Sequence, residues 1–561
     1  MREIHHSQPD ATSFRPEQAR GEWAIALLLF VLSALYLWPF HDVTILFVDE
    51  GIVLQGAERI LRGQVPYRDF FSFYTPGTYY WLAARLRLFG DTFLVARAML
   101  LLYGGLFSAR IYFLARRVCE RGTAILTTYL FLVIGLPNKF IVAHNWDSSV
   151  LACLALYCGV RLVEGGKWGW ALATGTLAAL TCLFEQSKGA GLVLGLGLGL
   201  FVVGSCSREG REVFRRRNLA ALAAGFVWPW ALTVSYFGMQ HCLTQMVADW
   251  FWPVFHYAGA NRLPYGYVNI PHANWEDLFG SASWGGRLAF VFLTAPCFIL
   301  PALPFVAAAL LIHAGRRLWK TKSGGSAAHY VVLVSAVALG LTLSVVVTGR
   351  TDYDHFVYIS PPLLLILGLV LGGQLVRSNL LDRVRPLLAT FFLIVFTALG
   401  MLFYLREPLG AHDRLETRRG PVRTPARDEV IPYLQAHTTT SQMILIYPYQ
   451  PIYYYLTATH SPTQFDYLQI GMHSPEQFAR AVADVAADPP TMVIWNLSFN
   501  TQTIIDGWPA TPLGAMAKDP LRDYIVAHYC PCTTLGSIGF RHLAMVRRDL
   551  PCEAGAAGRS P

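Results

Sequence analysis

The sequence predicts an all-α polytopic membrane protein that is followed by a small soluble α/β domain. Of its 561 residues, 54% are hydrophobic and only 14% are charged, whereas ordinary soluble domains carry about 25% charged residues. The apolar residues come in runs of roughly 17–25, each long enough to cross the hydrocarbon core of a bilayer. Strand-like and helix-like patterns alternate only after residue 404. Most of the chain is therefore expected to lie in a membrane.

The membrane part, residues 23–404, is expected to cross the bilayer about eleven times. The apolar stretch 169–204 is nearly continuous, but Arg and Lys flank it on both sides. Both flanks are thus expected on the same face, so the stretch crosses twice and turns near 185–189. The predicted spans are 23–40, 93–114, 123–136, 148–163, 169–184, 190–204, 219–237, 287–312, 330–348, 357–376 and 387–404.

Positive charge predicts the orientation of these spans. Inward segments hold about twenty-one Lys and Arg, against about nine in the outward loops, as the positive-inside rule expects. Residues 1–22 are therefore expected to be cytoplasmic, and the tail extracytoplasmic. The net charge of +9 reflects these short loops and no nucleic-acid groove, so we expect no nucleic-acid partner. Two outward loops, 41–92 and 238–286, are long, which indicates that the outer face is the working face.

The tail, residues 405–561, is predicted to be a small α/β domain. Residues 443–446 and 492–495 have the apolar character of buried strands. Ser474 is expected to begin a helix, because Pro475 suits the first helical turn.

Three of the ten cysteines, Cys530, Cys532 and Cys552, lie in the tail. An extracytoplasmic tail faces an oxidising compartment, so one pair among them is expected to be bridged. A bridge between Cys530 and Cys532, which only Pro531 separates, would be strained. Cys552 is therefore expected to be the partner of one of the other two.

Two adjacent carboxylates, Asp49 and Glu50, follow the first span directly and are candidate catalytic residues. The plainer interpretation is that they merely end a span, but a charge beside the hydrocarbon often has a function. Residues 52–63 have the apolar spacing of an amphipathic helix, which we expect along the membrane surface. Tyr67, Arg68 and Asp69 come next and are candidate substrate-binding residues.

Three further polar clusters lie in outward turns. His144 and Asp147 precede the fourth span, where Asp147 also suits helix capping. Lys188 lies in the turn between two short spans, and its partner is either a lipid phosphate or the nearby glutamate. Arg350 and His355 precede the tenth span and either hold a phosphate or belong to an ordinary interfacial loop.

The outward segment 250–257 is rich in aromatic residues. An interfacial belt is the simpler interpretation, and a wall for a lipid chain or a stacking surface for a sugar is the alternative. No CxxC pair or other diagnostic ligand spacing is present, so no zinc site is expected. A divalent metal held by the acids and histidines of the turns stays open.

The pattern around the first acids resembles a known enzyme family. An acidic residue after the first span, the motif GQVPYRDF at 63–70 and the turn TPGTYY at 75–80 are similar to bacterial members of the GT-C glycosyltransferase superfamily. The nearest group contains protein mannosyltransferases, aminoarabinose transferases and related lipid-A and polysaccharide enzymes. The resemblance extends to the span count, the orientation and the soluble tail.

This resemblance implies an inner-membrane enzyme that uses a polyprenyl-phosphate sugar donor and inverts the anomeric carbon. It also implies that Asp49 is the base or orients the acceptor, with Glu50 as its neighbour, and that Asp147 is the second acidic position. The chemistry has its own requirements, because a carboxylate must take the acceptor proton and cations must hold the departing phosphate.

The sequence leaves the acceptor open between lipid, glycan and protein. One alternative function is a transporter or flippase of lipid-linked sugars, but such proteins favour mid-membrane charges and repeated halves, and this chain shows no repeat. A second alternative is a polysaccharide ligase of similar architecture, which would move a whole glycan.

Overall fold

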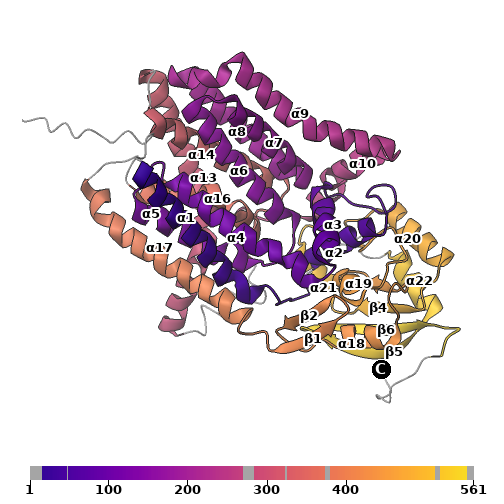
Figure 1. Ribbon diagram of the computed structural model, residues 1–561. Helices are drawn as coiled ribbons and strands as arrows, with labels where there is room; N and C mark the ends of the chain where they lie inside the picture. Colours follow the sequence, from indigo (N-terminus) through magenta and orange to yellow (C-terminus); the bar gives the residue numbers. More distant parts are fainter. Residues whose placement is uncertain are drawn as a thin grey trace, which may run out of the picture.

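A computed structural model describes residues 16–46, 48–268, 283–321, 325–372, 379–511 and 518–551. Long helices form a bundle, and the tail lies at one end of it, against α2 (Val48–Leu61) and α3 (Gly77–Phe89), as Figure 1 shows. The predicted fold class, a helical membrane bundle with a small α/β tail, is confirmed.

Each predicted span coincides with a helix, although the end of the tenth span lies outside the described residues. Among the described residues, 8 helices are long and apolar enough to cross a membrane, and α7 and α16 are shorter apolar helices. The helix at the predicted span 123–136, α5, belongs to neither group. The helices at the predicted spans are α1 (Pro16–Leu37), α4 (Phe93–Ala115), α5 (Arg121–Ile134), α6 (His144–Gly165), α7 (Trp168–Phe184), α8 (Gln186–Cys206), α9 (Arg216–Met239), α13 (Trp284–Thr321), α14 (Gly325–Val347), α16 (Ser360–Leu371) and α17 (Asn379–Arg406).

Small residues allow close helix packing in this bundle. Gly191 and Gly195 of α8 face Gly340 of α14, and a Cβ atom at any of the three would collide with the backbone of the other helix. Such contacts are typical of membrane helices, where close backbone approach replaces the hydrophobic driving force.

Shorter elements lie between the long helices of the bundle. The loop 238–286 forms α10, a π-helical turn and α11 before residues 269–282, which lie outside the described residues. The short elements are η1 (Trp38–Phe40), η2 (Leu136–Asn138), η3 (Glu209–Phe214), α10 (Leu243–Trp252), η4 (Pro253–Tyr257), α11 (Ala258–Ala260) and α15 (Tyr353–Tyr358).

The tail contains a two-stranded hairpin, β1–β2, and a four-stranded sheet in the order β3-β4-β6-β5. Strands β3 and β4, which match the two predicted buried strands, are parallel, and the other neighbours are antiparallel. Ser474 caps α20 as predicted, in a reciprocal capping box with Gln477. The tail elements are β1 (Asp413–Thr417), β2 (Gly420–Thr424), α18 (Val430–His437), β3 (Leu445–Tyr447), α19 (Ile452–Thr457), α20 (Pro475–Ala487), β4 (Met492–Asn496), α21 (Thr501–Gly507), α22 (Pro520–His528), β5 (Tyr529–Ser537) and β6 (Phe540–Arg547).

Helix α2 is covered by the tail, which differs from the expected helix on the membrane surface. Its residues from Glu50 to Arg59 are buried. Gly51 lies so close to the backbone of Ile452 in α19 that a Cβ atom would not fit there. The apolar face that suggested a membrane contact is instead buried against protein, because α19 and α3 pack on this helix.

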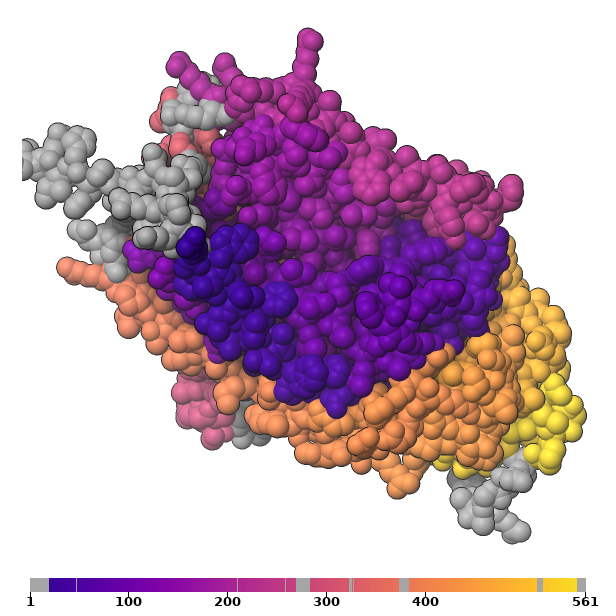
Figure 2. All heavy atoms as spheres, viewed as in Figure 1, coloured from indigo at the N-terminus to yellow at the C-terminus, as the bar shows by residue number. Residues whose placement is uncertain are grey.

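Ion pairs and apolar contacts together hold the tail on the first outer loop. Arg59 pairs with Asp466 at 2.7 Å, and Glu58 pairs with Arg419 at 2.6 Å. One hydrophobic core joins Leu54 of α2 to Ile452 of the tail. Tail atoms accordingly abut the atoms of this loop over a continuous surface in Figure 2.

The tail cysteines partly match the prediction. Cys532 is disulfide-bonded, whereas Cys530 is a free thiol. The two are therefore not bridged to each other, as expected. Cys552, the predicted partner, lies outside the described residues.

Candidate functional site

The two adjacent acids, Asp49 and Glu50, point to different surroundings at the start of α2. Glu50 is fully buried, pairs with Arg97 at 2.6 Å and accepts a hydrogen bond from the Val142 amide at 2.9 Å. Asp49 is half-buried, and within the described part of the chain its carboxylate makes no ion pair or hydrogen bond. Of the two carboxylates, only that of Asp49 is free to bind a substrate.

The charge of Asp49 acts on aromatic side chains from distant parts of the chain. His144, at the start of α6, packs against Tyr74 with the two rings tilted and their centroids 4.1 Å apart. Burial raises the pKa of Tyr74 well above its usual value, and the Asp49 charge raises it further. In the tail, burial and the same charge also raise the pKa of Tyr449 and Tyr467. The next two residues, Glu50 and Gly51, contact Arg97 of the bundle and Ile452 of the tail, so Asp49 lies where loop one, the bundle and the tail meet.

A cluster of charges lies beside these aromatic residues, at the loop before α15. Asp352 caps α15, contacts the His355 ring at 2.6 Å and pairs with Arg350 at 3.3 Å. Lys139, in the outer turn before α6, pairs with Asp354 at 2.8 Å. The positive and negative groups are interleaved, so each basic side chain is oriented by a carboxylate.

The charge of Asp49 also acts on this cluster. Burial lowers the pKa of Lys139, but the charges of Asp354, Asp49 and Asp352 outweigh burial and hold it well above the usual value. Burial raises the pKa of Asp352, but His355 and the neighbouring cations outweigh that effect and hold it well below the usual range. Lys139 therefore stays positively charged beside Asp354.

Arg350 connects this cluster to the tail. Its Nη1 atom donates a hydrogen bond of 2.8 Å to the carbonyl oxygen of Gly507, and its guanidinium lies 5.7 Å from the ring centroid of Trp508. The sequence predicted a phosphate-binding role for Arg350 but gave no sign of its contacts with α21.

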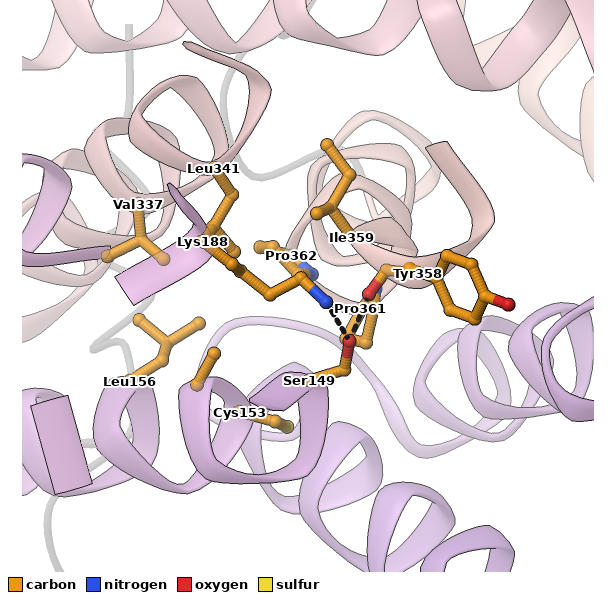
Figure 3. Close-up of a pocket in the computed structure, with 11 residues that line it drawn as sticks. Ser149, Cys153, Leu156, Lys188, Val337, Leu341, Tyr358, Ile359, Pro361 and Pro362 are labelled. Atoms are coloured by element: carbon orange, nitrogen blue, oxygen red, sulfur yellow. Dashed lines mark hydrogen bonds between the residues drawn. The ribbon is translucent and has the colours of Figure 1, made fainter. Parts of the chain in front are cut away.

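Lys188, on α8, faces Ser149 of α6 in a pocket that α14 and the junction of α15 and α16 also line (Figure 3). Its ammonium pairs with Glu185 at 2.9 Å and contacts the Ser148 and Ser149 hydroxyls and the Asn145 carbonyl within 3.0 Å. The side chain is only 2% exposed and lines a small pocket with Ser149 and Tyr358. Its ordinary partner is thus the nearby glutamate, one of the two alternatives that the sequence left open.

Asp147 lies one turn after His144, the first residue of α6, and is buried. Its Oδ1 atom accepts a hydrogen bond of 2.6 Å from Tyr103. Its Oδ2 atom has no geometrically satisfactory hydrogen bond among the described residues, although Thr78 lies near it. Asp147 is too far into the helix to act as its cap, since Ala143 occupies that position.

Tyr67, Arg68 and Asp69 shape the far end of loop one. Arg68 donates to Gln240 at 2.7 Å and to Asp69 at 2.8 Å, while Asp69 accepts from the Val65 amide at 2.7 Å. Tyr67 donates to the carbonyl oxygen of Tyr74 at 2.7 Å. These contacts fasten the loop to the end of α9 and fix the backbone of Tyr74, which packs against His144.

The aromatic segment 250–257 has two faces. Phe251, Val254 and Phe255 are exposed, as an interfacial belt requires. Trp252 is buried and stacks on Phe73 at 5.3 Å. The segment therefore presents apolar groups outward and packs on loop one inward, and the residues near 250 form part of the surface in Figure 2.

The sequence did not single out several groups of this site. Lys139 is one of the few cations in an outward turn, and that rarity was an available signal. Asp352 and Asp354 lie in the same polar turn as Arg350 and His355, the two residues selected there from the sequence. Tyr449 and Trp508 gave no signal, because their roles depend on how the tail docks. Among the described residues, no group of three or more His, Cys, Asp or Glu has metal-binding geometry.

Comparisons with known proteins give a consistent result. The profile of a family described as dolichyl-phosphate-mannose-protein mannosyltransferase matches residues 74–237. No curated protein matches the sequence.

Two solved structures are similar over nearly the whole chain. ArnT from Cupriavidus metallidurans in the apo state has a TM-score of 0.54 and 12% identity, over 94% of this chain and 98% of that one. The archaeal oligosaccharyltransferase AglB from Archaeoglobus fulgidus, in complex with an inhibitory peptide and a dolichol-phosphate, has a TM-score of 0.50 and 11% identity, over 95% of this chain and 75% of that one. Bundle and tail together therefore share the fold of these proteins.

Proposed function

We propose that this chain, which belongs to the GT-C superfamily of glycosyltransferases, moves one sugar from a polyprenyl-phosphate donor to an extracytoplasmic acceptor, with inversion. The acceptor is a lipid, a glycan or a protein. The observation that carries this proposal is the contrast between the free carboxylate of Asp49 and the locked carboxylate of Glu50, beside a group of cations.

Asp49 has the role of the base in this reaction. An acceptor hydroxyl attacks the anomeric carbon and its proton passes to the Asp49 carboxylate. The bond from that carbon to the phosphate oxygen breaks, and its electron pair leaves with the lipid phosphate. A positioned carboxylate speeds such a proton transfer, and the half-buried setting of Asp49 keeps its charge close to the reacting atoms.

Lys139 and Arg350 are proposed to hold the departing phosphate, with His355 beside them. Cations that are fixed before the reaction stabilise developing negative charge without reorganisation. Lys139 is held by Asp354, and Arg350 by Asp352, which gives both the needed rigidity. Lys188, His144 and Asp147 are proposed to support the site from α6 and α8, and Tyr67, Arg68 and Asp69 to shape loop one.

A lipid-phosphate donor is supported by two of the comparisons. The matching family is described by its use of dolichyl-phosphate-mannose, and the AglB structure contains a dolichol-phosphate. The exposed apolar face at 250–257 is a suitable contact for a prenyl chain at the membrane face.

The test is transfer of radiolabelled sugar from a panel of polyprenyl-phosphate sugars in purified membranes that contain the chain. We expect label to pass to an acceptor from at least one donor, and to be lost with Asp49→Asn. Movement of the intact lipid-linked sugar across the membrane without transfer would instead support a flippase. Transfer of an assembled glycan in place of one sugar would support a ligase.

The orientation is proposed from the charge pattern and has its own test. Reporter fusions after residue 420 should be active only when the reporter requires an extracytoplasmic location. Activity of a cytoplasm-dependent reporter there would contradict both the orientation and the site.

A further inference from the structure

Three aromatic residues of the tail, Tyr449, Tyr467 and Trp508, form a connected group beside Arg350. The Tyr449 ring meets Tyr467 edge to face at 5.1 Å and lies 6.1 Å from Trp508, also edge to face. Phe499 stacks behind Tyr449 at 4.6 Å. These rings come from three separate segments of the tail, so the group exists only in the folded domain.

The loop that carries Tyr449 is firmly held. The next residue, Gln450, is buried, and its Oε1 atom contacts Asn496 at 2.9 Å and His542 at 3.0 Å. Both partners lie in the tail sheet, in β4 and β6. A ring fixed in this way is suited to recognition, because binding needs little further ordering.

Trp508 connects Tyr449 to the proposed phosphate-binding cation, because its ring lies 6.1 Å from Tyr449 and 5.7 Å from the Arg350 guanidinium. Burial raises the pKa of Tyr449 well above its usual value, the charge of Asp49 raises it further, and the charge of Arg350 lowers it. Arg350 also contacts Gly507 and the Trp508 ring directly. In an inverting displacement the acceptor and the leaving phosphate lie on opposite faces of the anomeric carbon, so the sugar occupies the space between the base and that cation.

Trp508 provides an independent indication of a ligand. Its indole Nε1 atom is buried and has no hydrogen-bond acceptor among the described residues. A buried indole N–H usually has a partner. A hydroxyl group of a sugar bound beside Arg350 would supply the missing acceptor.

We propose that Tyr449, Tyr467 and Trp508 of the tail bind the sugar ring of the donor, so that the tail selects the sugar while the bundle holds the lipid phosphate. Aromatic faces pack on the apolar side of a sugar ring, and the hydroxyl and indole groups bind its polar edge. This inference rests on the proposed function and adds to it the part of the chain that sets sugar specificity.

The experiment measures two quantities in the full-length protein, the KM for the sugar-bearing donor and the affinity for the sugar-free polyprenyl phosphate. For Tyr449→Ala and Trp508→Ala we expect the KM for the sugar-bearing donor to rise about tenfold or more. Binding of the sugar-free polyprenyl phosphate, measured directly, should stay within about twofold of the wild type, because Arg350 and Lys139 are unchanged. Tyr449→Phe keeps the ring and should retain most of the donor affinity.

Tyr524→Ala, on α22, is the matched control, because Tyr524 stacks on His528 in the tail and has no contact with the aromatic group described above. It should leave both affinities unchanged. An unchanged donor KM in Tyr449→Ala and Trp508→Ala, in an active wild type, would overturn the inference. An equal loss of affinity for the sugar-free lipid would do the same. A wild type that transfers no sugar from any donor would instead reject the proposed function.

Discussion

Glu50 and Arg97 form a buried ion pair at 2.6 Å, one residue after Asp49, whose carboxylate has no such partner among the described residues. Arg97 also donates to the carbonyl oxygen of Phe40 at 3.3 Å, so the pair ties the start of α2 to η1 and to the start of α4. The ion pair fixes the position of Glu50 and therefore the orientation of the start of α2, which carries Asp49.

The two acids should therefore respond differently to neutralisation. Asn has the shape of Asp but cannot take a proton, so Asp49→Asn should lose about 10²–10⁴ in turnover with normal expression and melting temperature. Glu50→Gln leaves Arg97 buried without its counter-ion, which should destabilise the protein by about 3–5 kcal/mol. Turnover and thermal melting of both variants in detergent check this. Full activity in Asp49→Asn would exclude it as the base.

Substitutions of the two basic side chains proposed from the sequence, Arg350 and Lys188, should have different effects. Arg350→Ala should raise the donor KM by roughly 10–100-fold, because a charge-assisted contact with phosphate is lost. Lys188 is saturated by protein partners, so Lys188→Ala should chiefly lower the melting temperature. Donor kinetics and melting curves on the same preparations distinguish the two effects. A Lys188→Ala protein with wild-type stability but weak donor binding would assign the phosphate to Lys188.

The contact between loop one and the tail should depend on pH. Burial raises the pKa of Glu58 to about 7, although Arg419 and Arg62 oppose the rise. In the unfolded chain a glutamate titrates near pH 4.3. The folded state therefore holds the proton more strongly, and this contribution to stability falls as pH rises from about 4 to 7.

Glu58→Gln removes that titration and so provides the control. The difference in melting temperature between wild type and variant should shift in favour of the variant as pH rises from 5 to 8. A constant difference across this range would show that Glu58 does not titrate on folding.

The tail thiols give a prediction about the compartment. In native, unreduced protein, a thiol reagent followed by mass mapping should label Cys530 and leave Cys532 unlabelled. Reduction before labelling should expose Cys532 as well. Labelling of Cys532 without reduction would mean that the bridge is absent, and the argument for an oxidising compartment would then be lost.

The helices of the bundle were predictable because apolar runs and flanking charge reflect the bilayer, which acts on each span separately. The strands near 445 and 493 and the helix after Ser474 were predictable from local signals of the same kind. The setting of α2 was not, because an apolar helical face looks the same whether it meets lipid or another part of the protein.

The candidate site was predictable only in part. Asp49 and Glu50 stood out as a pair, but adjacent residues on a helix point about 100° apart, and only the position of Arg97 separates their surroundings. Arg350 stood out as a cation at the outer face. Tyr449 and Trp508 could not be found, because nothing local in the tail sequence marks a side chain that lies beside a distant residue of the bundle such as Arg350.

That separation affects how the chain is made. Arg59 pairs with a carboxylate 407 positions later, and α2 is buried only when α19 covers it. Contacts of such long range form late in folding. During synthesis the apolar face of α2 and the side chain of Arg59 therefore stay uncovered until nearly the whole chain has been made. A chain that stops before residue 466 could insert its spans, but it would lack the pairing that completes loop one, and quality-control proteases would meet that exposed loop first.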